Sequence, residues 1–261
     1  MKNAAAGGIF FRAGEPMKTA VIIPARMGSM RFPGKVLADL GGKPVIQHVW
    51  ENAMRSKADL VMVAADDVRV EQAVKAFGGQ VVMTKPSHPS GSDRVWEAAQ
   101  STDAELIVNV QGDEPFLPSQ VIDDLIDAMH GADSPAMGTV VLPCPRADIA
   151  SNPNLPKVVL TSDDYAIYFS RSMIPYLREG GEETTVYRHW GIYAYRRETL
   201  AKFVSLPEGR LEKCEKLEQL RALENGIRIK VIRTSFDSIG IDTPEDLVRA
   251  QEFLARRQKT I

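Results

Sequence analysis

A short apolar run followed by a basic, glycine-containing loop constrains this chain most. Residues 19–23 are apolar or β-branched, a pattern typical of a central strand of a parallel sheet. Residues 24–35 follow at once and contain three cations and two glycines. An open α/β sheet binds its ligands at the carboxyl ends of its strands, so we expect this loop to line a ligand site. The three cations of the loop favour a polyphosphate as the ligand.

Two common phosphate-binding loops do not match this segment. A Walker loop has one residue fewer than the stretch from Gly28 to Gly34, and Val36 stands where its metal-binding hydroxyl is needed. The dinucleotide fingerprint G-x-G-x-x-G is also missing after the strand. The sequence therefore argues against a P-loop NTPase and an NAD enzyme. The structural alternative is a solvated basic loop at a turn.

Strand and helix patterns alternate through the first half of the chain. Buried-strand patterns cover residues 60–64 and 106–110. Helices are expected over residues 44–56, 68–77, 93–100 and 119–130. This alternation predicts an α/β fold with a doubly wound, mainly parallel sheet.

After about residue 142 the pattern changes. Strands expected over residues 158–160, 166–169 and 191–195 no longer each lead into a helix. We therefore expect a smaller subdomain, inserted at approximately residues 143–210. A strand over residues 227–232 and a last helix should then return to the main body.

Composition fits an ordinary α/β protein and narrows the class of partner. The 32 basic and 34 acidic residues nearly cancel, so the chain lacks the broad positive field typical of nucleic-acid-binding proteins. Cys144 and Cys214 stand far apart and outside any C-x-x-C motif, which argues against a disulfide framework or a zinc site and is compatible with a reducing cytoplasm.

Targeting signals are not evident. No apolar run approaches the roughly 18 to 20 residues that span a bilayer, and residues 1–16 lack the apolar core and cleavage pattern of a secretion signal. We expect residues 1–16 to be a mobile leader and residues 17–261 to form one domain. We expect no nucleic-acid partner and no membrane insertion.

Two aspartates occupy positions from which they could reach the basic loop. Asp113 follows the predicted strand 106–110 across a Gln-Gly turn, which places it at the loop's edge of the sheet if the strands are parallel. Asp242 precedes Thr243-Pro244-Glu245-Asp246, a sequence typical of a capped helix start. Considered singly, each acid fits a surface turn or a helix start better than a metal site.

Motifs spread along the chain together resemble one enzyme family. The loop reads Ile-Pro-Ala-Arg-x-x-Ser-x-Arg-x-Pro-Gly-Lys. With the later blocks it is similar, in order and over nearly all of the chain from Met17, to the 3-deoxy-manno-octulosonate cytidylyltransferases (CMP-Kdo synthetases). Those blocks are LGGKPVI at 40–46, HPSGSDR at 88–94, VNVQGDEP at 108–115, YFSR at 168–171, RHWGIYAY at 188–195, LEQLR at 217–221 and GIDTPEDL at 240–247.

The resemblance implies a fold and an activity. It implies a nucleotidyltransferase-type fold in which the smaller subdomain binds the sugar and mediates dimerisation. It also implies a cytoplasmic homodimer that serves lipopolysaccharide biosynthesis. The implied reaction is Mg²⁺-dependent transfer of CMP from CTP to the anomeric hydroxyl of Kdo, with release of pyrophosphate. Two alternatives stay open: a cytidylyltransferase for a related acid sugar, sialic or amino-substituted, and a non-catalytic nucleotide-binding protein.

The resemblance also assigns roles to individual residues. Arg26, Lys35, Asp113 and Asp242 are the expected catalytic residues, and Asp113 with Asp242 are the expected Mg²⁺ ligands. Two carboxylates suffice because Mg²⁺ usually keeps water and substrate phosphates among its ligands. The nucleotide-binding residues are expected to be Pro24, Ala25, Arg26, Ser29, Arg31, Lys35, Ser90 and Gly91.

The sugar-side blocks carry cationic, amide and carboxylate groups suited to an acidic, hydroxyl-rich ligand. The expected sugar-binding residues are Gln111, Arg171, His189, Tyr193, Glu218 and Gln219. Leu211 and Cys214 precede Glu218 at helical spacing, which predicts that Glu218 lies on the inward face of a helix. The alternatives are a salt-bridged helix surface for Glu218 and a packing role for His189.

Overall fold

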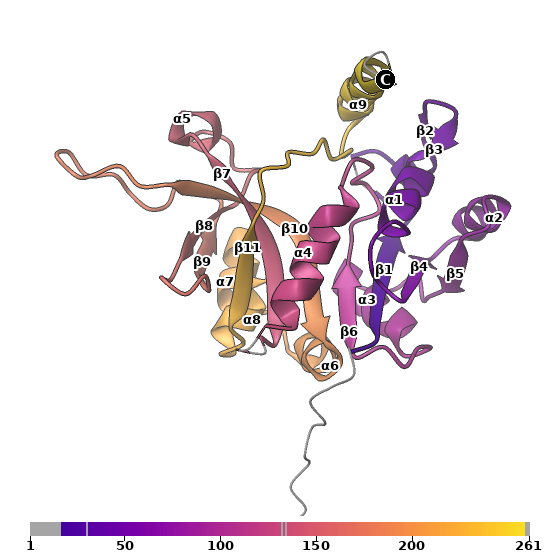
Figure 1. Ribbon diagram of the computed structural model, residues 1–261, viewed down its shortest axis with the longest axis horizontal. Coiled ribbons are helices and arrows are strands. Elements are labelled where there is room, and N and C mark those ends of the chain that lie inside the picture. The colour runs from indigo at the N-terminus through magenta and orange to yellow at the C-terminus, as the bar shows by residue number, and fades with distance from the viewer. Residues whose placement is uncertain (1–16, 30, 132, 134, 259–261) are drawn as a thin grey trace, which may run out of the picture.

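A central, mainly parallel sheet organises the protein. The computed structural model describes residues 17–29, 31–131, 133 and 135–258, so the expected leader lies outside it. Within these residues the main path of the sheet runs β11-β7-β10-β6-β1-β4-β5, and β8 pairs with β10 (Figure 1). Its strands are β1 (Thr19–Ala25), β4 (Leu60–Ala65), β5 (Gln80–Met83), β6 (Leu106–Asn109), β7 (Met137–Cys144), β10 (Val186–Arg196) and β11 (Ile229–Arg233).

The strand directions confirm the predicted fold class. β1 is parallel to β4 and β6, β4 to β5, and β7 to β11. Only β10 on this path runs antiparallel to its neighbours, β6 and β7. The carboxyl ends of β1, β4 and β6 therefore meet at one edge of the sheet, the upper edge in Figure 1.

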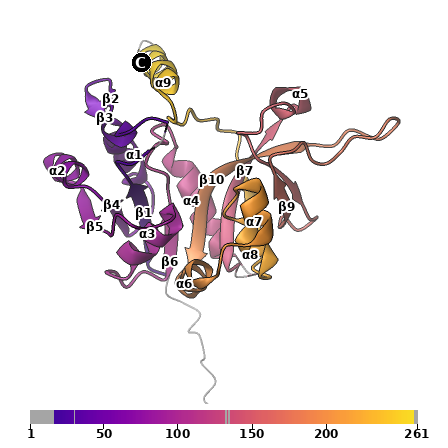
Figure 2. The ribbon, with the colours of Figure 1, turned by 180° about the vertical axis from the view of Figure 1, so that it is seen from behind.

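Helices cover both faces of the sheet (Figures 1 and 2). One layer holds α1 (Val45–Ala53), α2 (Val68–Ala76) and α4 (Ser119–Met129), and the other holds α3 (Gly91–Ala99), α6 (Arg197–Ser205), α7 (Arg210–Glu215) and α8 (Leu220–Glu224). Alternate residues of β1 serve the two layers, since Val21 and Ile23 pack in one core and Ala20 and Ile22 in the other. Burial on both faces explains why this strand reads as a continuous apolar run.

A third, smaller core lies above the sheet edge. It lies between the last helix, α9 (Pro244–Gln258), and a hairpin of β2 (Asp39–Leu40) and β3 (Lys43–Pro44). Leu40 of the hairpin and Ala250 of α9 are buried there together with Phe116 and Ile241 from the neighbouring loops. The predicted start of α9 is confirmed. Thr243 Oγ1 accepts from the backbone N of Asp246 at 3.3 Å, and the Asp246 carboxylate accepts from the backbone N of Thr243 at 2.9 Å.

The region after β7 forms a side lobe. It comprises α5 (Arg146–Ile149), β8 (Lys157–Leu160), β9 (Ala166–Ser170) and a long loop that projects from the body before β10. β10 falls inside the range 143–210 that the sequence assigns to a subdomain, yet it lies in the central sheet between β6 and β7. The lobe is thus narrower than that range.

Candidate functional site

The basic loop after β1 is held in a tight, internally bonded turn. The Met27 carbonyl accepts from the backbone N of Ser29 and of Gly34, both at 3.0 Å. Gly34 has φ +74°, a left-handed conformation that glycine adopts without strain. That turn sends the next residue inward at the start of a short 3-10 helix, η1 (Lys35–Leu37), and so buries Lys35.

Lys35 joins the two aspartates that the sequence could not bring together from spacing. Its Nζ donates to Asp113 Oδ2 and, at 2.7 Å, to Asp242 Oδ1. Burial alone would lower the pKa of Lys35, but the negative charges and hydrogen bonds of Asp113 and Asp242 outweigh it and raise the pKa above its usual value. Arg31 reaches the other oxygen of Asp242 at 2.9 Å. The two carboxylates therefore converge on one cation.

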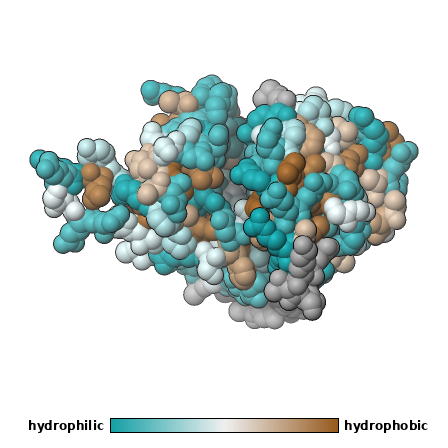
Figure 3. Space-filling model, turned by 90° about the horizontal axis from the view of Figure 1, so that it is seen from above, coloured by the Kyte–Doolittle hydropathy of each residue, from teal (hydrophilic) through white to brown (hydrophobic). Residues whose placement is uncertain are grey.

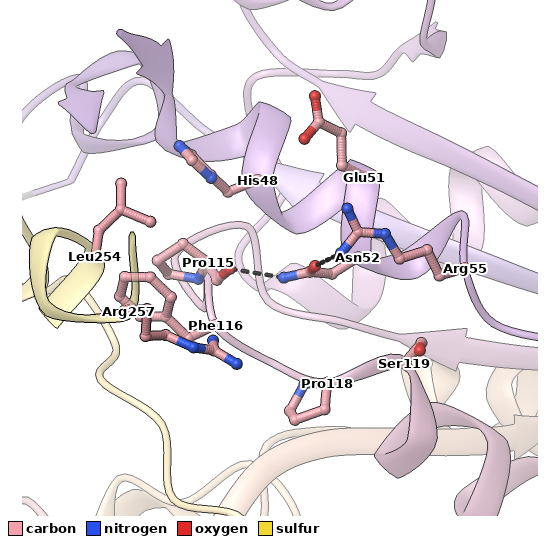
Figure 4. A pocket seen from close by; sticks show the side chains of 10 residues that line it. All are labelled: His48, Glu51, Asn52, Arg55, Pro115, Phe116, Pro118, Ser119, Leu254 and Arg257. Atoms are coloured by element: carbon pink, nitrogen blue, oxygen red, sulfur yellow. Dashed lines mark hydrogen bonds between the residues drawn. The ribbon is translucent and has the colours of Figure 1, made fainter. Parts of the chain in front are cut away.

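A close backbone approach brings the Asp113 loop to the end of β1. A Cβ on Gly112 would lie 2.7 Å from the carbonyl oxygen of Pro24, so this position has no room for a side chain. The loop is also tied to α1, where Asn52 Nδ2 donates to the Pro115 carbonyl at 2.8 Å (Figure 4). Figure 4 shows this support beside a separate cavity of about 410 Å³ between α1, α9 and the loop.

A polar cavity of about 180 Å³ opens above the Lys35 cluster. Several expected nucleotide-binding and catalytic residues line it together. They are Pro24, Arg26, Lys35, Gly91, Asp113 and Asp242, joined by Gln111 from the expected sugar set. Figure 3 looks onto this edge of the molecule and shows hydrophilic side chains along a central hollow.

Three other expected nucleotide-binding residues have structural roles: Ala25 in the core, Ser29 in the basic loop and Ser90 at the start of α3. Ala25 is fully buried in the core. The Ser29 hydroxyl accepts from the backbone N of Phe32 at 3.4 Å. Ser90 caps α3, where its hydroxyl accepts from the backbone N of Asp93 at 3.2 Å, and Gly91 is the first residue of that helix.

A wider cavity of about 740 Å³ adjoins the first one and shares Asp242 with it. His189 and Gln219, both expected on the sugar side, line this cavity, as does Arg31. The side-chain Nε2 of Gln219 is buried and has no hydrogen-bond partner among the described residues. An unpaired buried donor is costly, so it marks a position where a ligand oxygen would be stabilised.

His189 is a neutral, packed histidine. Burial lowers its pKa to about 3, its Nε2 lies 3.0 Å from the Thr139 hydroxyl, and its ring packs edge-on against Phe169 at 4.9 Å. Tyr193 also packs against the His189 ring, at 5.5 Å between ring centroids, and its burial raises the pKa of its hydroxyl. The packing alternative for His189 is therefore observed, although the residue also lines the cavity.

Glu218 is half-buried, with one carboxylate oxygen shielded from solvent, but this burial does not come from the helix that the sequence predicts. α7 ends at Glu215, Lys216 adopts a left-handed conformation, and Leu211 and Cys214 face solvent. The predicted inward helical stripe is thus wrong, because the chain breaks between α7 and α8. Burial raises the pKa of Glu218, opposed by hydrogen bonds from Ser90 and Ser92. Its Oε1 has no partner in the described part of the chain.

Arg171 makes contacts typical of a structural anchor. Its guanidinium donates to the backbone carbonyls of Pro153, Glu215 and Lys216, at 2.8, 2.6 and 3.1 Å. These bonds tie the lobe to the end of α7. Arg171 does not line either of the two cavities above, so its role toward a sugar carboxylate stays a prediction.

Four further residues complete the site. Arg94 bonds Asp66 at 3.1 Å, and Asp66 accepts from the backbone N of Met27 at 3.1 Å, so this pair anchors the basic loop. Glu114 and Arg188 line the wider cavity. The sequence analysis did not assign these four residues to the site. Arg94, Glu114 and Arg188 fall inside the motifs that carry the family resemblance, so those motifs could have indicated them, whereas Asp66 lies outside every motif.

Comparison with known proteins identifies the family of this chain. The sequence profile of the family described as Cytidylyltransferase matches residues 20–229. The 3-deoxy-manno-octulosonate cytidylyltransferase of Thermodesulfovibrio yellowstonii is 48% identical over 252 residues, covering 91% of this chain and 98% of the relative. The chain belongs to this family. The family member from Parabacteroides distasonis is 50% identical, covering 92% of this chain and 100% of its own length.

Solved structures extend the comparison to the fold. CMP:2-keto-3-deoxy-manno-octonic acid synthetase complexed with CTP superposes with a TM-score of 0.88 at 41% identity, covering 92% of this chain and 99% of that one. A 4-diphosphocytidyl-2C-methyl-D-erythritol synthase from Anaerococcus prevotii has a TM-score of 0.62 at 14% identity, covering 92% and 100%. The second likeness shows only that the fold is shared.

Proposed function

We propose that this chain transfers CMP from CTP to the anomeric hydroxyl of Kdo and releases pyrophosphate. The observation that carries the proposal is the convergence of Lys35, Asp113 and Asp242 at the floor of a polar cavity lined by the basic loop. The family relationship supports the choice of CTP and Kdo.

The chemistry follows from the charges around the cavity. The sugar hydroxyl attacks the α-phosphorus, a new O–P bond forms, and the bond between that phosphorus and the bridging oxygen breaks, so pyrophosphate leaves with the electron pair. Such phosphoryl transfer is accelerated mainly by positioning and by neutralising charge on the phosphate oxygens. Arg26, Arg31 and Lys35 supply that charge from one loop.

The two carboxylates fit a divalent cation. Asp113 and Asp242 already converge on one cationic group, the Lys35 ammonium, and carboxylate oxygens are the ligands that Mg²⁺ prefers. Among the residues the structure describes, no group of three or more His, Cys, Asp or Glu side chains forms a complete metal cage. We infer that Asp113 and Asp242 would hold Mg²⁺ together with substrate oxygens and water. When bound, Mg²⁺ would neutralise phosphate charge and make the sugar hydroxyl easier to deprotonate.

The wider cavity supports an acceptor rich in hydroxyls. Gln219 presents an unpaired buried donor there, which a hydroxyl oxygen of a ligand would satisfy. Glu218 also has an unpaired oxygen, but it lines neither cavity, so its role toward a sugar stays a prediction. Arg31, Arg188 and Arg249 also line this cavity, beside the carboxylates of Glu114, Asp242 and Asp246, so it offers charged donors and acceptors to a polar ligand. The family relationship supports an acid sugar as that ligand.

We further propose a cytoplasmic homodimer that serves lipopolysaccharide biosynthesis. The loop before β10 projects from the body and exposes Leu177 and Tyr176, the latter 87% exposed, which suits burial against a second copy. Cys144 and Cys214 are both free thiols, as a reducing compartment would keep them. Among the described helices, none is both long and apolar enough to cross a membrane.

Pyrophosphate release tests the activity. Wild-type protein, CTP and Mg²⁺ would be assayed with Kdo, with sialic and amino-substituted acid sugars, and without sugar, beside Lys35→Ala. Release with Kdo that Lys35→Ala abolishes would support the proposal. Release only with another acid sugar would change the acceptor, and CTP binding without release under any condition would indicate a non-catalytic nucleotide-binding protein.

A further inference from the structure

The segment that carries Asp242 has no regular secondary structure of its own. Between β11 and α9, residues 234–243 cross the upper edge of the sheet as an extended chain (Figure 1). One backbone hydrogen bond joins this crossing segment to the Asp113 loop, from the Ile241 N to the Asp113 carbonyl at 2.9 Å. The separation of the two carboxylates therefore depends on how these two irregular segments are held together.

Glu114 supplies a side-chain contact between the same two segments. It follows Asp113 directly, and its Oε2 accepts a hydrogen bond from Ser238 Oγ at 3.0 Å. Its Oε1 lies against Gly240, where a Cβ would come within 2.8 Å of that oxygen. The carboxylate thus contacts the crossing segment at two points just before Asp242.

We propose that Glu114 is a positioning residue that fixes the Asp242 carboxylate opposite Asp113. This inference rests on the proposed function, because it concerns the metal and phosphate chemistry at those two carboxylates. The Asp113 loop is already tied to α1 through Asn52, so Glu114 extends that support to the crossing segment. Groups that orient metal-binding carboxylates affect metal affinity and activity without touching the metal themselves.

Gly240 provides a test that leaves Glu114 itself unchanged. Its backbone does not need a positive φ, so alanine is strained there only by its contact with the Glu114 carboxylate. Gly240→Ala should push that carboxylate away from Ser238. Glu114→Ala removes the group that would clash, so Gly240→Ala should have little further effect in that background. Independent structural roles would instead give additive effects.

The experiment compares Glu114→Ala, Glu114→Gln, Ser238→Ala, Gly240→Ala and the Glu114→Ala/Gly240→Ala double variant. Glu198→Ala, an exposed residue on α6, is the control. Steady-state kinetics over a Mg²⁺ titration would be paired with calorimetry of Mn²⁺ binding in the presence of CTP. Amide hydrogen exchange at Ile241 would be measured without metal or substrate.

We expect Glu114→Ala and Gly240→Ala each to lower kcat or weaken metal binding by roughly 10- to 100-fold. CTP binding without metal should be unchanged, and Ile241 should exchange faster. Ser238→Ala should have a smaller effect in the same direction, and Glu114→Gln, whose amide oxygen can still accept from Ser238, should recover most of the loss. The double variant should resemble Glu114→Ala alone.

Additive losses in the double variant, or unchanged metal binding and Ile241 exchange in Glu114→Ala, would overturn the inference. Failure of the proposed function is a separate result. It would appear as a wild-type protein that releases no pyrophosphate with any acid sugar. The hydrogen-exchange comparison would still report whether Glu114 holds the crossing segment.

Discussion

Replacing Asp113 or Asp242 by asparagine should separate catalysis from folding. Asparagine keeps the side-chain shape but removes the negative charge that Lys35 now faces. The Asp113 side chain is 26% exposed and that of Asp242 is 51% exposed. Lys35 itself is buried, but each variant leaves it one carboxylate and the replaced side chain is partly open to water, so we expect a loss of about 1 kcal/mol, the upper end for accessible ion pairs. A loss of 1 kcal/mol lowers Tm by about 2–4 °C in a chain of about this size, and Asp113→Asn, at the less exposed position, should lower it more.

Turnover should fall far more than stability. Removing one preorganised charge-stabilising group typically costs about 10²- to 10³-fold in kcat, which corresponds to about 2.7–4 kcal/mol of transition-state stabilisation at about 1.36 kcal/mol per tenfold. CMP transfer would be measured over a Mg²⁺ titration beside thermal melts. Asp148→Asn, at an exposed position on α5, is the matched control. Near-normal turnover at low Mg²⁺ in both site variants would refute the assignment of these carboxylates to the metal.

The central fold was predictable because its strands are buried on both faces. The strands around residues 19–23, 60–64 and 106–110 lie within or largely within β1, β4 and β6, since burial on two faces leaves continuous apolar runs. β7 and β10 were harder. β10 runs antiparallel in the centre of the sheet, a pairing that depends on residues far apart in the sequence.

Local periodicity misled the prediction where the chain breaks. Leu211, Cys214 and Glu218 have helical spacing, but the left-handed Lys216 ends α7 before Glu218 is reached. A non-glycine residue rarely adopts that conformation, so the sequence carries no signal for it. Glu218 is nevertheless half-buried, and its carboxylate accepts a hydrogen bond from Ser92 of α3 at 2.9 Å.

The site also contains residues that the sequence pattern could place and residues that it could not. The basic loop and Asp113 could be placed at one edge of the sheet from the strand pattern alone. Bringing Asp242 to Lys35 required the family resemblance, because an irregular segment carries it across the sheet edge. Glu114 was not predicted, since its role depends on contacts with Ser238 and Gly240 from that same segment.

The remaining predictions concern Lys35, Arg171 and His189. Lys35→Ala should slow single-turnover CMP transfer at saturating CTP by about 10²- to 10³-fold, and Lys35→Arg should not fully restore it, because a planar guanidinium cannot replace a compact ammonium; an unchanged rate would make Lys35 a structural residue. Arg171→Ala should raise the Kdo concentration needed for transfer while calorimetry shows near-normal CTP binding, and a fall in Tm without a change in Kdo dependence would leave Arg171 with only its anchoring role. His189 should make the fold sensitive to mild acid. Burial holds the native pKa of His189 at about 3, below the usual histidine value of 6.5, so the unfolded chain binds more protons between these values and stability falls as pH falls through that window. Between pH 7.5 and 5.5 the loss should be about 1.4 kcal/mol from this one group. Urea unfolding of wild type and His189→Asn at both pH values measures it, and an equal loss in the two proteins would show that other groups cause the acid sensitivity.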